Sequence, residues 1–212
     1  MVMDSSSPEI EPLVARAKTG DQEALAELFE SYRGRLRRLV DLRMDRRLQG
    51  RIDASDVLQE AYLDLAKKLP AYDRRNDLPF FLWLRLVTGE RLLQIHRRHL
   101  DAGKRGAAME VSLYRGAMPS AEPITLARSL FGRFTSPSNG AIRAEVQVRL
   151  QEMLNSMDAI DREILVLRHM EELSNEEAAT VLGLKKTAAS NRYIRALKRL
   201  RSVLAEMPGF TP

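Results

Sequence analysis

Four carboxylates recur at helical spacing in the first half of the chain. They are Asp53, Asp56, Glu60 and Asp64, and a helix that starts after Asp53 places the last three on one face with Gln59. Carboxylates that share a face can bind a metal ion or act as general acid and base. No histidine or second acidic motif converges on them in the sequence. The pattern therefore favours a ridge that docks another protein, or a plain solvated face, over a catalytic site.

A second chemically informative group lies near the C-terminus. From Lys185 to Arg201 the chain has seven cations and no acid. A solvated helix face usually mixes the two signs, whereas unmixed cations suit a phosphate backbone. Short hydrogen-bonding side chains among them can read base edges in a major groove. The candidate DNA-binding residues here are Lys185, Lys186, Thr187, Ser190, Asn191, Arg192, Arg195 and Arg199.

Two helices must position these cations. Ser174 and Glu177 form the Ser-x-x-Glu pattern of a capping box at the start of a short helix, and Gly183 is a turn residue at its end. Apolar residues from Ala188 to Leu204 then recur at helical spacing. Helices joined by a short glycine turn predict a helix-turn-helix. A helix over 158–170 is expected to lead directly into it.

The acids belong to a separate set of predicted helices over residues 10–100. Gly20 ends the first helix, Asp21 caps the second, and Asp53 is the expected N-cap of the helix that bears the acids. Pro70 ends that helix, and Pro79 suits the first turn of the next one.

The helix after Pro79 combines aromatic and basic residues. It holds the cluster Phe80–Trp83 and ends with Arg91, Arg97 and Arg98 as candidate DNA-binding residues. Aromatic rings followed by cations can stack and hold single-stranded bases, although such rings are more often core. His96 and His99 lie three apart without an accompanying carboxylate or thiolate, so no metal site is predicted there.

The composition bounds the class of protein. The chain has 212 residues, a net charge of +5 and a pI near 9.7, which favours polyanionic partners. It has no cysteine, which excludes a disulfide scaffold, a thiolate zinc site and a cysteine nucleophile. The polar, acidic residues 1–12 are no signal peptide, and no apolar run is long enough to span a bilayer. These features predict a soluble cytoplasmic protein without a cofactor.

The domain organisation follows from shifts in composition. Residues 1–9 are expected to be a disordered tail, 10–100 a first helical domain, and 142–207 a second one with the helix-turn-helix. Residues 101–141 are rich in glycine and proline and are typical of a linker, within which Thr125–Ser138 has no assigned role. The expected fold class is all-α, with two small helical domains joined by a long linker.

The order of motifs resembles the extracytoplasmic-function (ECF) sigma factors of RNA polymerase. The resemblance is carried by DASDVLQEAYLDLAKKL, FFLWLRLVTGERLLQIHRRH, REILVLRH and LSNEEAATVLGLKKTAASNRYIRALKRLR, and it covers about residues 10–205. Two positions differ from the frequent family pattern. Thr187-Ala188-Ala189 stands where the family often has Gly-Thr-Val at the start of the recognition helix. Glu90 stands where the family often has an asparagine in the melting helix, and the role of Glu90 is unassigned.

The resemblance implies a role for each domain. Residues 10–100 would act as sigma region 2, which binds core polymerase and melts the −10 element, and 142–207 as sigma region 4, which reads the −35 element. The partners implied are the β′ clamp and β flap of core polymerase, promoter DNA and an anti-sigma factor. The residues that would bind polymerase are Asp53, Asp56, Gln59, Glu60 and Asp64. The Tyr72–Arg98 stretch would melt and capture DNA.

Two other classes remain open at this point. A stand-alone helix-turn-helix regulator would bind duplex DNA tightly as a homodimer, but it leaves the acidic ridge and the aromatic cluster without a role. A metal-dependent nuclease using Asp53, Asp56 and Glu60 would lack a converging second shell. The expected protein is therefore an alternative sigma factor that binds core polymerase, directs promoter recognition, melting and initiation, and carries out no covalent chemistry itself.

Overall fold

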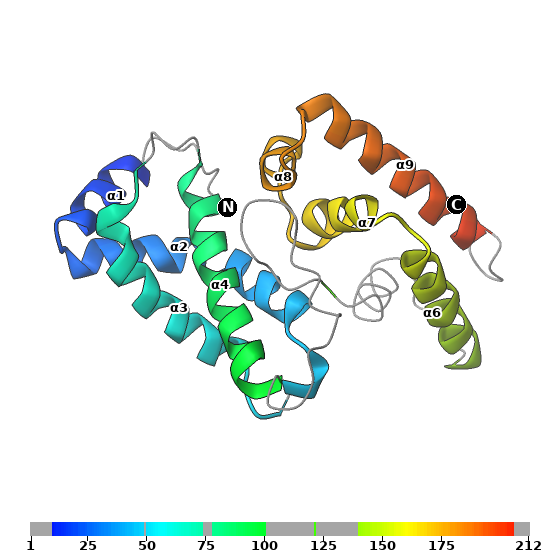
Figure 1. The fold of residues 1–212 in the computed structure, drawn as a ribbon, viewed down its shortest axis with the longest axis horizontal. Coiled ribbons are helices and arrows are strands. Elements are labelled where there is room, and N and C mark those ends of the chain that lie inside the picture. Colours follow the sequence, from blue (N-terminus) through cyan, green and yellow to red (C-terminus); the bar gives the residue numbers. More distant parts are fainter. Residues whose placement is uncertain (1–9, 49, 74–77, 101–120, 122–139, 206–212) are drawn as a thin grey trace. The chain divides into compact units, whose positions relative to one another are not determined.

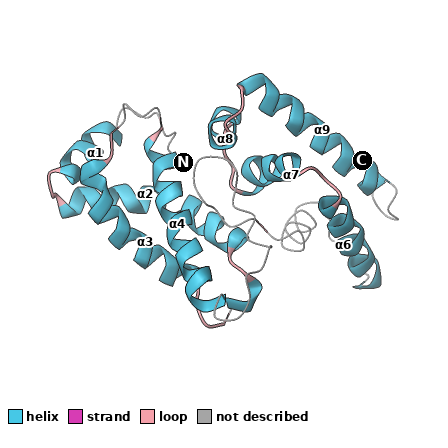
Figure 2. Ribbon diagram, in the orientation of Figure 1, coloured by secondary structure: helices cyan, strands magenta, loops and turns pink. Residues whose placement is uncertain are grey.

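The computed structural model describes residues 10–48, 50–73, 78–100, 121 and 140–205. Within them the secondary structure is helical, without a strand, which confirms the all-α fold class (Figure 2). The chain forms two compact units, 1–119 and 120–212. The predicted tail and most of the predicted linker, with Thr125–Ser138, lie outside the described residues. None of the described helices is long and apolar enough to cross a membrane.

Within its described residues, the first unit is built from four α-helices and two short 3-10 turns (Figure 1). Helix α2 packs against α1, α3 and α4, and α3 lies alongside α4. Leucines from α2, α3 and α4, with Tyr32 at the centre, fill the core. The elements are α1 (Ile10–Lys18), α2 (Gln22–Arg43), η1 (Arg46–Leu48), α3 (Ala54–Lys68), η2 (Leu69–Ala71) and α4 (Phe80–Leu100).

Local signals set the ends of these helices as the sequence predicts. Gly20 follows α1 with a φ of +98°, and the Asp21 carboxylate accepts a hydrogen bond from the backbone N–H of Ala24 at 3.0 Å. At α3, the Asp53 carboxylate accepts from the N–H of Asp56 at 3.0 Å, and Asp56 accepts from the N–H of Asp53 at 2.9 Å. Each pair satisfies N–H groups that the first turn leaves without a partner.

The second unit arranges its helices around α9. Its elements are α6 (Gly140–Asn155), α7 (Ala159–Leu165), the π-helical turn η4 (Val166–Met170), α8 (Asn175–Leu182) and α9 (Lys186–Ala205). Helix α9 packs against α6, α7 and α8. This unit has its own core, formed by residues such as Leu154, Ile164, Leu182, Ala196 and Leu200.

The predicted helix-turn-helix is present as α8 and α9. The Ser174 hydroxyl accepts from the N–H of Glu177 at 3.1 Å, and the Glu177 carboxylate accepts from the N–H of Ser174 at 2.7 Å, so the capping box is confirmed. Gly183 takes the left-handed conformation with a φ of +64°. The N–H groups of Gly183 and Leu184 donate to carbonyls in the last turn of α8, which closes the helix and starts the turn.

The expected helix over 158–170 differs in one respect. It is α-helical only to Leu165, and the next five residues form the π-helical turn, in which the N–H of Glu171 donates to the carbonyl of Val166 at 2.9 Å. Glu172 follows with a positive φ of +58°. Helical periodicity alone does not distinguish these two hydrogen-bond patterns, because the extra residue shifts the apolar face only at the end of the segment.

Candidate nucleic-acid interface and docking surface

The outward face of α9 presents most of the predicted DNA-binding side chains to solvent. Exposed residues recur along it at intervals of three and four, and no acid interrupts them within the helix. Some of the exposed cations also make contacts within the unit. Lys186 pairs with exposed Glu176 at 3.0 Å, Arg195 lies 3.9 Å from Asp161, and Arg199 donates to the Ser156 hydroxyl at 2.9 Å. Ser190 is half-buried. The exposed predicted residues are Lys185, Lys186, Thr187, Asn191, Arg195 and Arg199.

Arg192 does not fit its predicted place among the base-reading residues. Its guanidinium lies 2.6 Å from the buried Asp161 carboxylate and 3.4 Å from that of Asp158, the N-cap of α7. The side chain is 28% exposed and turns toward the body of the unit. The structure thus shows Arg192 linking α9 to α7 by ion pairs, on a side of α9 that faces the body of the unit.

The same side of α9 is fixed by Tyr193. Its hydroxyl lies 3.0 Å from Nε2 of His169, and the guanidinium of Arg168 lies 5.3 Å from the centre of its ring. With Tyr193 and Arg192 turned inward, the next residue, Ile194, points outward and is half exposed. Sequence reasoning missed Ile194. The available signal was an isolated large apolar residue outside the apolar stripe of the helix.

Only some of the residues predicted to form an acidic ridge on α3 are exposed to solvent. Asp53, Asp56 and Gln59 are exposed, although the two aspartates also form the capping box. Leu63 is 57% exposed on the same side, three or four residues from Gln59 and Glu60, and was not predicted. Its exposure could have been predicted from spacing, because position 63 lies outside the apolar stripe of the helix.

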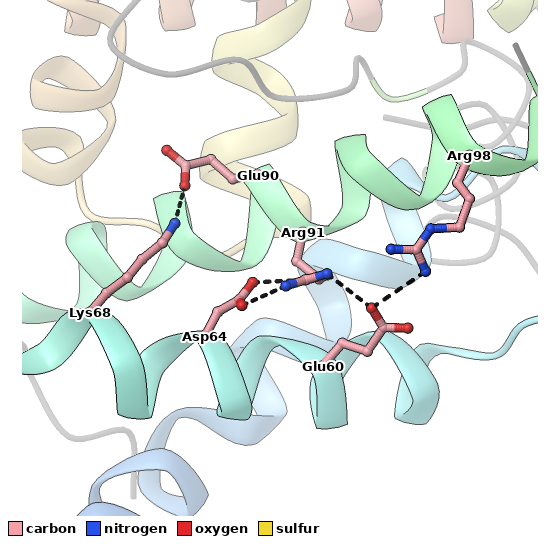
Figure 3. A network of polar contacts seen from close by, with 6 residues as sticks. All are labelled: Glu60, Asp64, Lys68, Glu90, Arg91 and Arg98. Carbon is pink, nitrogen blue, oxygen red and sulfur yellow. Dashed lines mark hydrogen bonds and ion pairs between the residues drawn. The ribbon is translucent and has the colours of Figure 1, made fainter.

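Asp64, predicted from the sequence as a polymerase contact, is buried in the structure. It accepts two hydrogen bonds from the Arg91 guanidinium of α4, one of them at 2.7 Å from Nε (Figure 3). Position 64 lies within the apolar stripe of α3, after Val57 and Ala61. An acid in such a stripe needs a cation from a neighbouring helix, because a buried carboxylate without a partner is strongly unfavourable.

Arg91, a predicted DNA-binding residue, forms its ion pairs within the first unit. Besides Asp64 it donates to Glu60 at 3.1 Å, and the hydrogen bonds to Asp64 hold the pKa of Arg91 above its usual value. Glu90, whose role the sequence left open, pairs with Lys68 of α3 at 2.6 Å. A seam of ion pairs therefore joins α3 to α4 (Figure 3), while Arg97 and Arg98 remain exposed at the end of α4.

The aromatic cluster divides into core and surface. Phe80 and Phe81 are buried and pack against Tyr32, with ring centroids 5.9 and 5.3 Å away. Trp83 is half-buried and packs on Tyr72 at 4.8 Å. Of these three residues, only Trp83 has a surface on which a base could stack. The core interpretation is thus correct for both phenylalanines.

His96 contributes to the fold of the first unit rather than to an exposed site. It is buried, and its Nε2 accepts a hydrogen bond from the backbone N–H of Asp45 at 3.2 Å. Burial lowers the pKa of His96 below its usual value; Asp45 opposes this effect and Arg47 adds to it. The described residues contain no group of three His, Cys, Asp or Glu side chains placed to hold a metal ion.

We expect the stability of the first unit to fall on mild acidification because of His96. The folded state binds fewer protons at this site than the unfolded chain. Its contribution is therefore complete above about pH 6.5 and declines below that, by up to about 1.4 kcal/mol per pH unit. His96→Gln should flatten this decline, since an amide stays neutral. Urea unfolding at several pH values, followed by the fluorescence of Trp83, measures it.

The single tryptophan makes this readout specific to the first unit. His99→Gln is the matched control, because His99 is exposed on the same helix. Parallel pH profiles for the wild type and His96→Gln would show that another group causes the acid sensitivity.

Comparisons with known proteins agree with this arrangement. The family described as Sigma-70, region 4 matches residues 147–200, and a helix-turn-helix domain family matches 11–73. The ECF RNA polymerase sigma factor SigD of Mycobacterium tuberculosis is 29% identical over 94% of this chain and 85% of its own length. SigW of Bacillus subtilis is 22% identical over 93% and 98%, respectively.

A solved structure also has this fold. CnrH, in complex with the cytosolic domain of CnrY, aligns with a TM-score of 0.53 and 22% identity over 95% of this chain and 98% of that one. The second unit matches the region 4 family of sigma-70 proteins over its helix-turn-helix. The relatives that align with most of this chain are ECF RNA polymerase sigma factors, and the function that these comparisons support is that of an alternative sigma factor.

Proposed function

We propose that this sigma factor docks on core RNA polymerase through the outward face of α3 and contacts promoter DNA through α9 and the end of α4. The observation that carries the proposal is that each of the two units has a charged surface of a different kind, suited to a different partner. One is a helix-turn-helix whose second helix has cations and no acids, and the other is an acidic helix face with an exposed leucine. The chain would then supply positions and contacts, and the polymerase the chemistry.

Each unit has a proposed role. The first, over 10–100, would hold polymerase with Asp53, Asp56, Gln59 and Leu63 and capture the −10 element with Trp83, Arg97 and Arg98. The second, over 142–207, would read the −35 element, and 101–141 would link them. The proposed partners are the β′ clamp, the β flap and promoter DNA, and the proposed location is therefore the cytoplasm.

An anti-sigma partner is part of the proposal. It is supported by the CnrH fold, which was solved in complex with the cytosolic domain of CnrY.

Run-off transcription tests the proposal. Purified chain and core polymerase are supplied with a library randomised around the −35 and −10 positions, and the transcribed templates are sequenced. Enrichment of a two-part motif is expected only when both proteins are present. A chain that instead selects a palindromic duplex without polymerase would be a stand-alone regulator, and the proposed docking would be wrong.

The exposed residues of α9 should separate into base readers and phosphate contacts. Lys198 is exposed near the end of the helix, where a contact goes to phosphate, and Asn191 lies nearer its start. We expect Lys198→Ala to weaken all selected promoters alike and to reduce the salt slope by about 0.9. Asn191→Ala should instead relax base preference at one position.

The measurement is holoenzyme binding to the selected promoters over a series of salt concentrations. A change of base preference in Lys198→Ala, with none in Asn191→Ala, would show that α9 enters the groove in a different register.

A further inference from the structure

Glu60 is shared between two arginines of α4. Its Oε2 atom lies 3.1 Å from a terminal nitrogen of Arg91 and 3.9 Å from one of Arg98 (Figure 3). The Glu60 side chain is 37% exposed, so an approaching protein can reach it. One carboxylate thus lies between the face of α3 that is proposed to dock polymerase and the end of α4 that is proposed to bind DNA.

The seam between α3 and α4 does not depend on Glu60. Asp64, whose side chain is 12% exposed, takes two nitrogens of Arg91 in a paired geometry, which is the stronger form of this interaction. Lys68 and Glu90 tie the same helices at another point. Glu60 can therefore change partner while the two helices stay together.

Arg98 is the weakly held member of this network. Its side chain is 57% exposed, and the Glu60 carboxylate lies 3.9 Å from its guanidinium. An ion pair in solvent contributes little, so a DNA phosphate or a cation on another protein can compete for either member. While Glu60 holds Arg98, it also places a negative charge where a phosphate would bind.

We propose that Glu60 couples polymerase docking on α3 to DNA binding by Arg98. The inference rests on the proposed function. A cation of the docking partner draws Glu60 toward the outer face of α3, and Arg98 is then available to a phosphate of single-stranded DNA. Because the two binding free energies are linked, DNA at Arg98 also favours docking by the same factor.

The test compares Glu60→Gln with Glu90→Gln in the full chain. Both substitutions remove one negative charge from the seam, but Glu90 is paired with Lys68 and not with Arg98. The readout is the affinity for a fluorescent single-stranded oligonucleotide of randomised sequence. We expect Glu60→Gln to bind it about two- to fivefold more tightly than the wild type, the range for an exposed ion pair, and Glu90→Gln to show little gain.

Two further measurements show whether the gain in oligonucleotide affinity comes from release of Arg98 or from the loss of a negative charge in general. In an Arg98→Ala background, Glu60→Gln should give no gain. In the presence of saturating core polymerase, the difference between Glu60→Gln and the wild type should disappear, because docking has already moved Glu60. Equal gains from Glu60→Gln and Glu90→Gln, or a gain that persists without Arg98, would overturn the coupling.

These outcomes are distinct from failure of the proposed function. If the wild type does not bind core polymerase, the docking itself is wrong. If it binds, and the two glutamine variants behave alike, only the coupling through Glu60 is wrong.

Discussion

Replacing Arg192 with alanine is expected to destabilise the second unit by about 2 kcal/mol and to weaken transcription from all promoters alike. Removing one partner of a buried ion pair costs about 3–5 kcal/mol because the other charge is left uncompensated. The expected loss of stability is lower here because this ion pair is only partly buried. The Arg192 side chain is 28% exposed, and that of Asp161 is 10% exposed. Hydrogen exchange of the amides of α7 and α9 measures the loss directly.

Arg195→Ala is the matched control. Arg195 lies 3.9 Å from Asp161 and its side chain is largely exposed, so its removal should change stability by well under 1 kcal/mol. An Asp161→Asn background provides a second check. There the carboxylate is gone, and Arg192→Ala should cost much less. If Arg192→Ala instead leaves exchange unchanged and alters base preference, Arg192 reads DNA, as its position in the sequence first suggested.

Leu63→Asp is expected to weaken docking on the β′ clamp by about 30-fold while leaving the fold intact. Interface residues that dominate affinity contribute about 2 kcal/mol or more, and they are large side chains that become fully buried in the complex. Leu63 is 57% exposed and lies among polar side chains that would form the rim of such a contact. The measurement is the Kd of the full chain for a purified β′ clamp fragment.

Val148→Asp provides the control for this variant. Val148 is 54% exposed on α6 of the second unit, so the same change of an apolar to a charged side chain is made away from α3. It should leave affinity for the β′ clamp fragment unchanged. Unaltered binding by Leu63→Asp would place the docking surface elsewhere on the unit.

The same exposure explains why Leu63 is a sharper probe than the acids predicted from the sequence. Asp56 also caps α3, and Glu60 also holds Arg91, so charge reversal at either would alter the helix as well as the surface. Leu63 has no such second role among the contacts that the structure describes. The loss of binding can therefore be assigned to the interface itself.

The parts of the fold predicted correctly were those decided within a few residues. The capping boxes at Asp53 and Ser174 and the left-handed Gly183 depend on atoms at most five positions apart, and each is present. Helical faces were also predictable, because apolar residues at intervals of three and four must be buried together. The helix-turn-helix followed from these local features alone.

The side chains that the structure places differently from the sequence-based expectation have partners far away in the sequence. Asp64 and Arg91 are 27 residues apart, and Asp161 and Arg192 are 31 apart. A charged residue at the edge of an apolar stripe can face either solvent or a buried partner. The outcome depends on how the two packed helices are rotated relative to each other. Spacing along one helix does not fix that rotation, so Asp64, Arg91 and Arg192 were first assigned to a partner molecule.

The two units have separate hydrophobic cores, and this has a consequence for genetics. A chain whose second unit has lost its fold keeps the α3 face, and on the proposed function it still occupies core polymerase without selecting a promoter. Such a chain would compete with the intact protein, and with other sigma factors, for a shared pool of enzyme. On the proposed function, damage to the second unit would therefore be dominant when the allele is overexpressed, whereas damage to the α3 face would be recessive.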